Sequence, residues 1–123
     1  MTTIGSMAAA TAEDLITTTV LDYFEGWFEG DAARMDRALH PDLVKRDAGE
    51  LELTTKGQMV EATAGGVGVK RAAGRRVDID VEVVDVWGDA ASVVVRSAIY
   101  HEYLHLVRTT GGWRIVDALW QFS

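Results

Sequence analysis

The segment 101–122, HEYLHLVRTTGGWRIVDALWQF, decides the fold class, because it opens with a helical metal motif and otherwise reads as two strands. Its first five residues match H-E-x-x-H, which on a helix holds zinc between two histidines, with the glutamate activating water. The flanks, SVVVRSAI before and LVRTTGGWRIV after, favour strand. On a strand, His101 and His105 lie ~13 Å apart at ~3.3 Å per residue. Two zinc ligands must lie within ~4 Å of each other. No His or Glu follows His105 to supply a third ligand. We therefore predict strand structure and no metal site.

Composition narrows the class of protein. The chain has 123 residues, 48% of them hydrophobic and 25% charged, as in an ordinary soluble globular protein. The net charge of −7 argues against a nucleic-acid partner, and the absence of cysteine excludes disulfides and thiolate sites. The start lacks a signal peptide, and no apolar run is long enough to span a membrane, so we expect a cytoplasmic protein without membrane contact. Residues 1–10 are expected to be a disordered tail, and 11–123 a single domain.

The first half of the chain has a helical hydrophobic period. Thr11 and Asp14 suit a helix N-terminus. The helix that follows carries Ile16, Val20, Tyr23, Phe24 and Trp27 at helical spacing and ends at Gly30. A second, shorter helix should begin at Asp31 and close at His40-Pro41.

A hairpin is predicted next, with strands 43–47 and 50–54. Thr55 should cap a third helix, which Gly65-Gly66 stops, and residues 65–76 should form a loop rich in glycine and basic residues. Its segment 70–76, KRAAGRR, either grips a phosphate or is a solvated loop.

From Val77 onward the hydrophobic period is two, which predicts a meander of antiparallel strands. The fold class is therefore α+β, with N-terminal helices on one face of a bent sheet. The faces of the last strand, counted with period two, put Val116, Trp120 and Phe122 opposite Trp113, Ile115, Asp117 and Leu119. Since helices cover only one face of a sheet, we expect a homodimer through the sheet.

Three stretches carry a resemblance to a known family: YFEGWFEGDAARMDRALHPDLVKR (23–46), RRVDIDVEVVDVWGDAASVVV (75–95) and EYLHLVRTTGGWRIVDALWQF (102–122). Together they resemble the lumazine-binding branch of the nuclear transport factor 2-like superfamily, with SnoaL-like cyclases and ketosteroid isomerases as relatives. The resemblance implies a cone-shaped fold, in which three N-terminal helices pack on a strongly curved, mostly antiparallel sheet with a pocket between them. That fold hosts enzymes, binders and transport factors, so it leaves function open.

The resemblance also implies a catalytic pair. In ketosteroid-isomerase-like relatives a tyrosine on the first helix faces an aspartate on the first strand, and Tyr23 and Asp47 fall at similar spacings here. A carboxylate near apolar walls is a general base, and a buried phenol stabilises an enolate oxygen. Two alternatives remain open. Asp47 suits a turn, and Lys45 could pair with it and hold it ionised.

Two further residues are candidates for acid/base chemistry. His40 is either a helix cap or a pocket acid/base. Asp117 is a carboxylate on an apolar strand face, which needs a partner or a raised pKa. The candidate ligand-binding residues are Trp27, Tyr103, His105 and Trp120.

These residues predict a pocket protein for an apolar or aromatic small molecule. An acid/base enzyme of isomerase, cyclase or dehydratase type is the leading hypothesis. A non-enzymatic ligand-binding protein and a dimeric association module are the alternatives. No cofactor is expected, because the sequence has neither G-x-G-x-x-G after a strand nor a P-loop.

Overall fold

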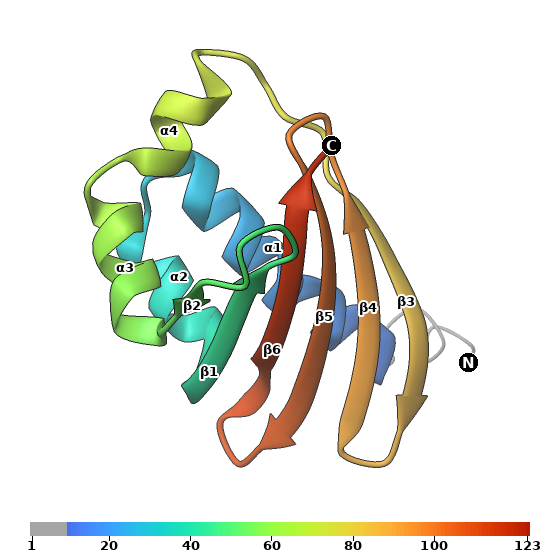
Figure 1. The fold of residues 1–123 in the computed structure, drawn as a ribbon. Coiled ribbons are helices and arrows are strands. Elements are labelled where there is room, and N and C mark those ends of the chain that lie inside the picture. Colours follow the sequence, from blue (N-terminus) through green and yellow to red (C-terminus); the bar gives the residue numbers. More distant parts are fainter. Residues whose placement is uncertain (1–9) are drawn as a thin grey trace.

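The computed structural model describes residues 10–123 and shows helices packed against one sheet (Figure 1). The predicted tail lies outside the described residues except for Ala10. The helices are α1 (Ala12–Glu29), α2 (Ala32–Ala38), α3 (Lys56–Ala64) and α4 (Val67–Ala72). The strands are β1 (Leu39–Asp47), β2 (Leu53–Thr54), β3 (Asp80–Trp87), β4 (Ala90–Arg96), β5 (Tyr100–Thr109) and β6 (Gly112–Phe122). Within residues 10–123, none of the helices has both the length and the hydropathy that crossing a membrane requires.

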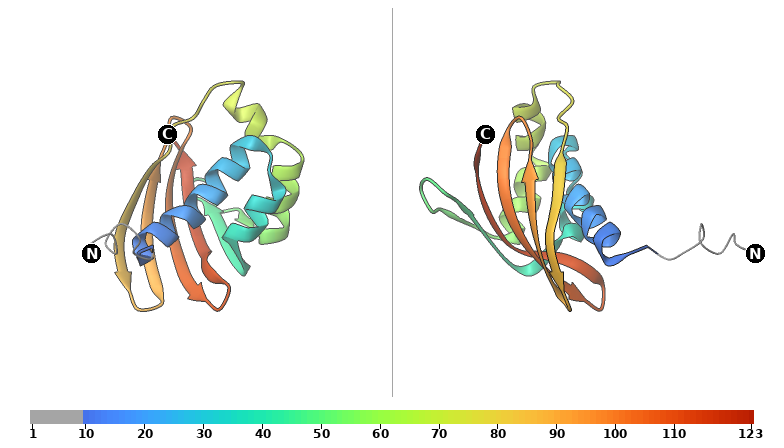
Figure 2. Two further views of the ribbon diagram at one scale, coloured as in Figure 1. Left: turned by 180° about the vertical axis from the view of Figure 1, so that it is seen from behind. Right: turned by 90° about the vertical axis from the view of Figure 1, so that its right-hand side faces the viewer.

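Helix α1 follows from its caps and its apolar stripe. Thr11 and Asp14 form a reciprocal capping box, and Gly30 ends the helix at φ +73°, a conformation that glycine adopts without strain. The predicted stripe is buried in the core: Ile16, Val20, Tyr23, Phe24 and Trp27. Seen from behind, α1 runs diagonally across one face of the sheet (Figure 2, left).

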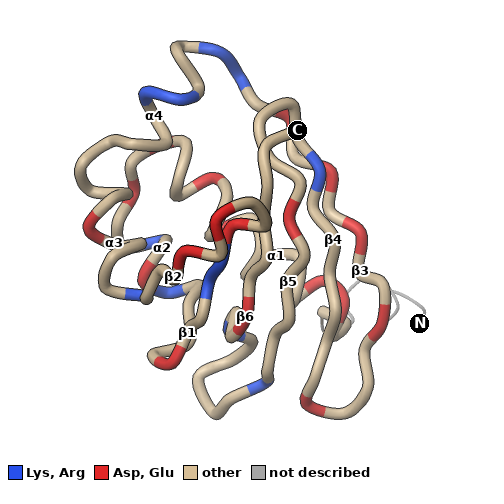
Figure 3. Tube along the Cα trace, viewed as in Figure 1, with Lys and Arg blue, Asp and Glu red and all other residues tan. Residues whose placement is uncertain are grey.

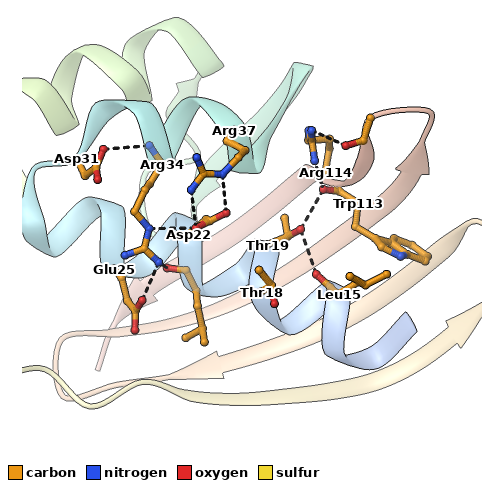
Figure 4. A network of polar contacts seen from close by, with 12 residues as sticks. Leu15, Thr18, Thr19, Asp22, Glu25, Asp31, Arg34, Arg37, Trp113 and Arg114 are labelled. Atoms are coloured by element: carbon orange, nitrogen blue, oxygen red, sulfur yellow. Dashed lines mark hydrogen bonds and ion pairs between the residues drawn. The ribbon is translucent and has the colours of Figure 1, made fainter. Parts of the chain in front are cut away.

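Buried charge joins α1 to α2. The Asp22 carboxylate accepts hydrogen bonds from Arg34 Nε at 3.0 Å and from Arg37 Nε at 3.0 Å (Figure 4). Burial alone raises the pKa of Asp22, but the hydrogen bonds and charges of Arg37 and Arg34 outweigh it, so the net pKa is lowered. This pairing holds α2 against α1, and β1 starts directly after α2.

The sheet has the order β2-β1-β6-β5-β4-β3, with every pair antiparallel except β1 and β6. The meander from β3 to β6 confirms the predicted hairpins, and the sheet curves around the helices as expected (Figure 2, right). Because β1 returns from the helices and joins β6 in parallel, residues from both halves of the chain meet at the centre of the sheet. The face away from α1 carries no helix in the part of the chain that is described.

A β-bulge interrupts the pairing of β5 with β6. His105 pairs with Asp117 and Leu106 with Ile115, which leaves Val116 as an extra residue. Trp113 and Ile115 therefore point to the helices, but so do Ala118 and the partly buried Trp120. The predicted two-face arrangement of the last strand was wrong beyond Ile115, because one extra residue exchanges the faces of everything that follows it.

Segment 65–76 was also predicted incorrectly as a loop throughout, since it contains α4. Gly68 packs so closely on α1 that an added Cβ would lie 2.2 Å from the Trp27 carbonyl oxygen. The sequence of α4 has little helical periodicity, so this short helix depends on its packing against α1 for stability. The hairpin predicted at 43–54 forms, but β2 has only two residues and the loop before it is longer than expected.

Candidate functional site

A cavity of about 210 Å³ lies between the helices and the sheet. It is enclosed by α1, α3 and α4 on one side and by β1, β5 and β6 on the other. Most of its wall is apolar, with ionisable groups concentrated at a few positions. The lining residues are Tyr23, Phe24, Trp27, Lys45, Thr54, Met59, Ala62, Val67, Arg71, Tyr100, Glu102 and Trp120.

Three ionisable side chains from three different elements meet in this cavity. Tyr23 on α1 donates a hydrogen bond of 2.5 Å to Oε1 of Glu102 on β5. Lys45 on β1 donates to the Tyr23 hydroxyl, and its Nζ lies 3.3 Å from the same Glu102 oxygen. Only 1% of the Glu102 surface is exposed, so the cluster is shielded from bulk water. We call Tyr23, Lys45 and Glu102 the buried triad.

Burial sets the protonation of two members of the triad. Desolvation, and then the charge of Glu102, raise the pKa of Tyr23 well above its usual value, which keeps the phenol protonated. Desolvation lowers the pKa of the Lys45 ammonium, and the Glu102 carboxylate opposes that change. The triad therefore combines a phenol that stays a donor with an amine that is easier than usual to deprotonate.

A second polar group lies on the Tyr100 side of the cavity. Trp27 Nε1 donates to the Tyr100 hydroxyl at 2.9 Å, and Arg71 Nη1 donates to the same oxygen at 2.8 Å. The Tyr100 ring stacks on Phe28 and Phe122, with centroid distances of 5.9 and 5.7 Å. These contacts hold the Tyr100 hydroxyl in a fixed place on the cavity wall.

Of the residues predicted for the site, Tyr23, Trp27 and Trp120 line this one cavity together. Trp120 reaches it only because the bulge at Val116 turns the end of β6 toward the helices. The Lys45 ammonium lies 5.5 Å from the centre of the Trp120 ring.

Asp47 does not line the cavity with Tyr23, which corrects the expected arrangement of that pair. It shares a strand face with Lys45 as predicted, but two residues carry it ~6.6 Å further along β1, at ~3.3 Å per residue. There its Oδ1 accepts a hydrogen bond of 2.5 Å from the Glu50 amide, in the loop before β2. The turn alternative describes its position, and Lys45 pairs with Glu102 instead.

His40 also lies outside the cavity lining. It is the second residue of β1 and does not belong to α2, and its Nδ1 accepts a hydrogen bond of 3.0 Å from the Asp42 amide. Helix α2 ends at Ala38 with Leu39 as its C-cap, so His40 is not the helix cap that the sequence suggested.

Asp117, His105 and Tyr103 lie on the sheet face away from the helices, so the structure does not bring them to the Tyr23 cavity. Asp117 Oδ2 lies 3.4 Å from His105 Nδ1, with both side chains exposed. Asp117 was expected on the apolar face that carries Trp113 and Ile115. That expectation was wrong because the bulge at Val116 turns Asp117 to the opposite face.

Sequence reasoning missed Glu102 and Tyr100, included Arg71 only within the segment 70–76, and offered Asp47 as the partner that Lys45 could pair with. Glu102 was considered only as the glutamate of the zinc motif. A signal was present: on a strand, Tyr100, Glu102, Leu104 and Leu106 share one face, and a lone carboxylate on an otherwise apolar face needs buried partners.

Comparison with known proteins matches residues 11–121 to the family described as "Putative lumazine-binding". The chain belongs to this family. The match spans both halves of the cavity, from α1 to β6. No curated protein matches the chain.

Several solved structures share the fold of this member of the family. An NTF2-like protein from Cytophaga hutchinsonii has a TM-score of 0.73 at 16% identity, covering 93% of this chain and 100% of that one. An NTF-2 like protein of unknown function from Silicibacter pomeroyi has a TM-score of 0.67 at 21% identity, covering both chains fully. A ketosteroid isomerase-like protein from Erwinia carotovora atroseptica has a TM-score of 0.65 at 18% identity, covering 88% and 93%. At these identities the likeness establishes an NTF2-like fold, within which function varies.

Proposed function

We propose that this protein binds a small, largely apolar molecule in the cavity and transfers a proton on it through the buried triad. The observation that carries the proposal is the convergence of Tyr23, Lys45 and Glu102 on the wall of an otherwise apolar cavity. Perturbed ionisable groups inside a concave apolar site are the usual mark of acid/base chemistry.

The contacts of Glu102 leave one oxygen for a ligand. Both neighbours in the triad engage Oε1, and Oε2 accepts no hydrogen bond from any residue between 10 and 123. Glu102 lines the cavity, so Oε2 is the atom able to take a proton from a bound carbon acid. The C–H proton moves to Oε2, and the electron pair of that bond becomes the enolate. Protonation of Glu102 weakens its hold on the Tyr23 proton, so the Tyr23 hydroxyl, kept protonated by its raised pKa, can turn its hydrogen bond from Oε1 to the developing enolate oxygen.

Exchange of a carbon-bound proton tests this step. Phenylacetone is a neutral single-ring ketone whose benzylic protons exchange slowly in D₂O, and proton NMR follows their loss. The wild-type protein should accelerate that exchange, and Glu102→Gln and Tyr23→Phe should each reduce the protein-dependent rate by about 10²- to 10⁴-fold. Near-UV circular dichroism checks that each variant is folded.

Two carboxylates that lie outside the cavity supply matched controls. Asp47→Asn and Asp117→Asn change the same functional group as Glu102→Gln and should leave the exchange rate unchanged. Exchange no faster than in buffer with the wild-type protein would overturn the proposal. So would a Glu102→Gln variant that keeps the full rate.

A non-enzymatic binding protein is the second candidate, and one observation favours it. Apart from Glu102 Oε2, the side-chain nitrogen and oxygen atoms of the triad all have partners within the described part of the chain. The triad can therefore hold the shape of the cavity without exchanging protons. Wild-type protein that binds phenylacetone, yet does not accelerate exchange, would identify a binder.

We also propose a homodimer through the sheet face away from α1, on separate grounds. That face exposes large apolar side chains on three strands: Trp87, 84% exposed, with Tyr103 and Leu119, which pair across β5 and β6. Such a surface favours association. Sedimentation equilibrium at micromolar concentration should give the mass of a dimer for the wild-type protein and the mass of a monomer for Tyr103→Glu. A monomeric wild-type protein would contradict it.

A further inference from the structure

Arg71 lies where the cavity meets the surface. It lines the inner cavity and also an outer depression of about 470 Å³, whose wall includes Trp120 and Phe122 and the acidic residues Asp47, Glu50 and Glu52. One of its nitrogens donates to the Tyr100 hydroxyl, and its Cζ lies 5.2 Å from the centre of the Phe122 ring. A side chain shared by the two spaces marks the point at which a ligand in the cavity reaches solvent.

Donor groups at this point are in excess. A tyrosine hydroxyl has one proton to donate, and the Tyr100 oxygen already accepts from Trp27 and Arg71. No acceptor for the Tyr100 proton occurs among residues 10–123, and only one of the five guanidinium N–H groups of Arg71 is used in a hydrogen bond there. The mouth of the cavity therefore presents unused donors that converge on one place.

The charge of Arg71 has no acidic partner either. Arg34, Arg37, Arg96 and Arg108 form ion pairs within the described part of the chain, whereas Arg71 forms none. Figure 3 shows Lys and Arg gathered on α4 and on the segment after it. The charge of Arg71 also contributes to the lowering of the Lys45 pKa, although the opposite effect of the Glu102 carboxylate is larger. An anionic group on a ligand is favoured there.

The volume limits the rest of the ligand. A dry apolar cavity of ~150 Å³ takes one benzene molecule. This cavity, at about 210 Å³, holds one ring and a short substituent. The aromatic rings of Trp27, Tyr100 and Trp120 on its wall suit a flat ligand.

We propose that the cavity is selective for a single-ring aromatic carboxylate, whose ring lies among Trp27, Tyr100 and Trp120 and whose carboxylate accepts hydrogen bonds from Arg71 and Tyr100. The inference rests on the proposed function only in using the same cavity. It concerns binding alone, so it is tested without turnover.

Benzoate and benzamide form a matched pair of probes, since they share the ring and differ in the anionic group. Indole N–H signals in NMR titrations report the site: Trp27 donates to Tyr100, whereas Trp87 lies on the opposite face. Benzoate should shift the Trp27 signal and leave that of Trp87 in place, with a Kd at least tenfold below that of benzamide. Loss of a hydrogen bond to a charged group weakens binding by roughly tenfold or more.

The variants Arg71→Met and Arg75→Met separate the proposed contact from net charge. Both remove one arginine from the same segment, but Arg75 is bonded to backbone carbonyls outside the cavity. Arg71→Met should abolish the preference for benzoate and leave benzamide binding within about twofold, whereas Arg75→Met should behave as wild type. Equal binding of the two probes to wild type, an unchanged preference in Arg71→Met, or failure of both probes to bind would overturn the inference. If the wild-type protein prefers benzoate but does not accelerate proton exchange, the proposed enzyme activity is refuted and this inference stands.

Discussion

Replacing Glu102 by Gln should be among the most destabilising single changes in this protein. The substitution keeps the shape of the side chain and removes its charge. Lys45 then remains in the core with its side chain only 12% exposed, and Tyr23 loses a charged acceptor at 2.5 Å. Removing one partner of a buried ion pair costs about 3–5 kcal/mol, because the remaining charge is left without compensation. That is a large part of the ~5–15 kcal/mol that stabilises a typical domain.

Urea denaturation followed by tryptophan fluorescence measures this loss. A triple variant, Tyr23→Phe, Lys45→Met and Glu102→Leu, supplies the control, since it removes all three members of the triad and so leaves none of them as an unpaired buried charge. Its free energy of unfolding should lie within ~1 kcal/mol of wild type or above it, as when other buried ionic triads are replaced by apolar residues. The triple variant should still lack proton exchange, which separates stability from activity.

The pH dependence of Glu102→Gln provides a second check. Without the carboxylate, desolvation lowers the Lys45 pKa further, while the unfolded chain keeps a value near ~10.4. Between those two values the unfolded state binds more protons, so the stability of the variant should rise with pH until about pH 10, where the unfolded lysine also loses its proton. The reasoning fails if Glu102→Gln lies within ~1 kcal/mol of wild type, or if the triple variant is as unstable as the single one.

Three further predictions concern the frame around the cavity. Gly68→Ala places a Cβ 2.2 Å from the Trp27 carbonyl oxygen, so α4 must move; unfolding in urea should show a loss of ~1–3 kcal/mol, and benzoate affinity should fall with it. Asp22→Asn should cost ~1–3 kcal/mol at pH 7, and the wild-type advantage should shrink as the pH falls from ~4 through the lowered folded pKa of Asp22, because protonation removes the stabilising charge; an acid titration of stability that is identical in the two proteins would contradict this. His105→Ala should change stability by less than ~0.5 kcal/mol and leave exchange intact, since its pairing with Asp117 is exposed, and a greater effect in the same urea assay would give the outer sheet face a structural role.

Local sequence was enough for most elements of the fold. The Thr11–Asp14 capping box, the apolar stripe of α1 and the period of two after Val77 are interactions between near neighbours in the chain, so they can be read without knowing the fold. The same local argument rejected a helical zinc site at HEYLH, and β5 passes through that string. Tyr23, Trp27 and Trp120 were likewise named as pocket candidates, Tyr23 because of the family resemblance.

Tertiary structure decided what the cavity contains. Glu102 becomes the centre of the triad because β1 returns from the helices to lie parallel to β6, which brings Lys45 within 3.3 Å of a residue 57 positions later in the chain. Asp47 misses the cavity by two residues along the same strand face, and Asp117 is moved to the opposite face by one extra residue at Val116. Helix α4, which carries Arg71, packs its Gly68 against the backbone of α1. Each of these outcomes depends on strand register or on contact between distant segments, and a period counted along one segment contains no information about either.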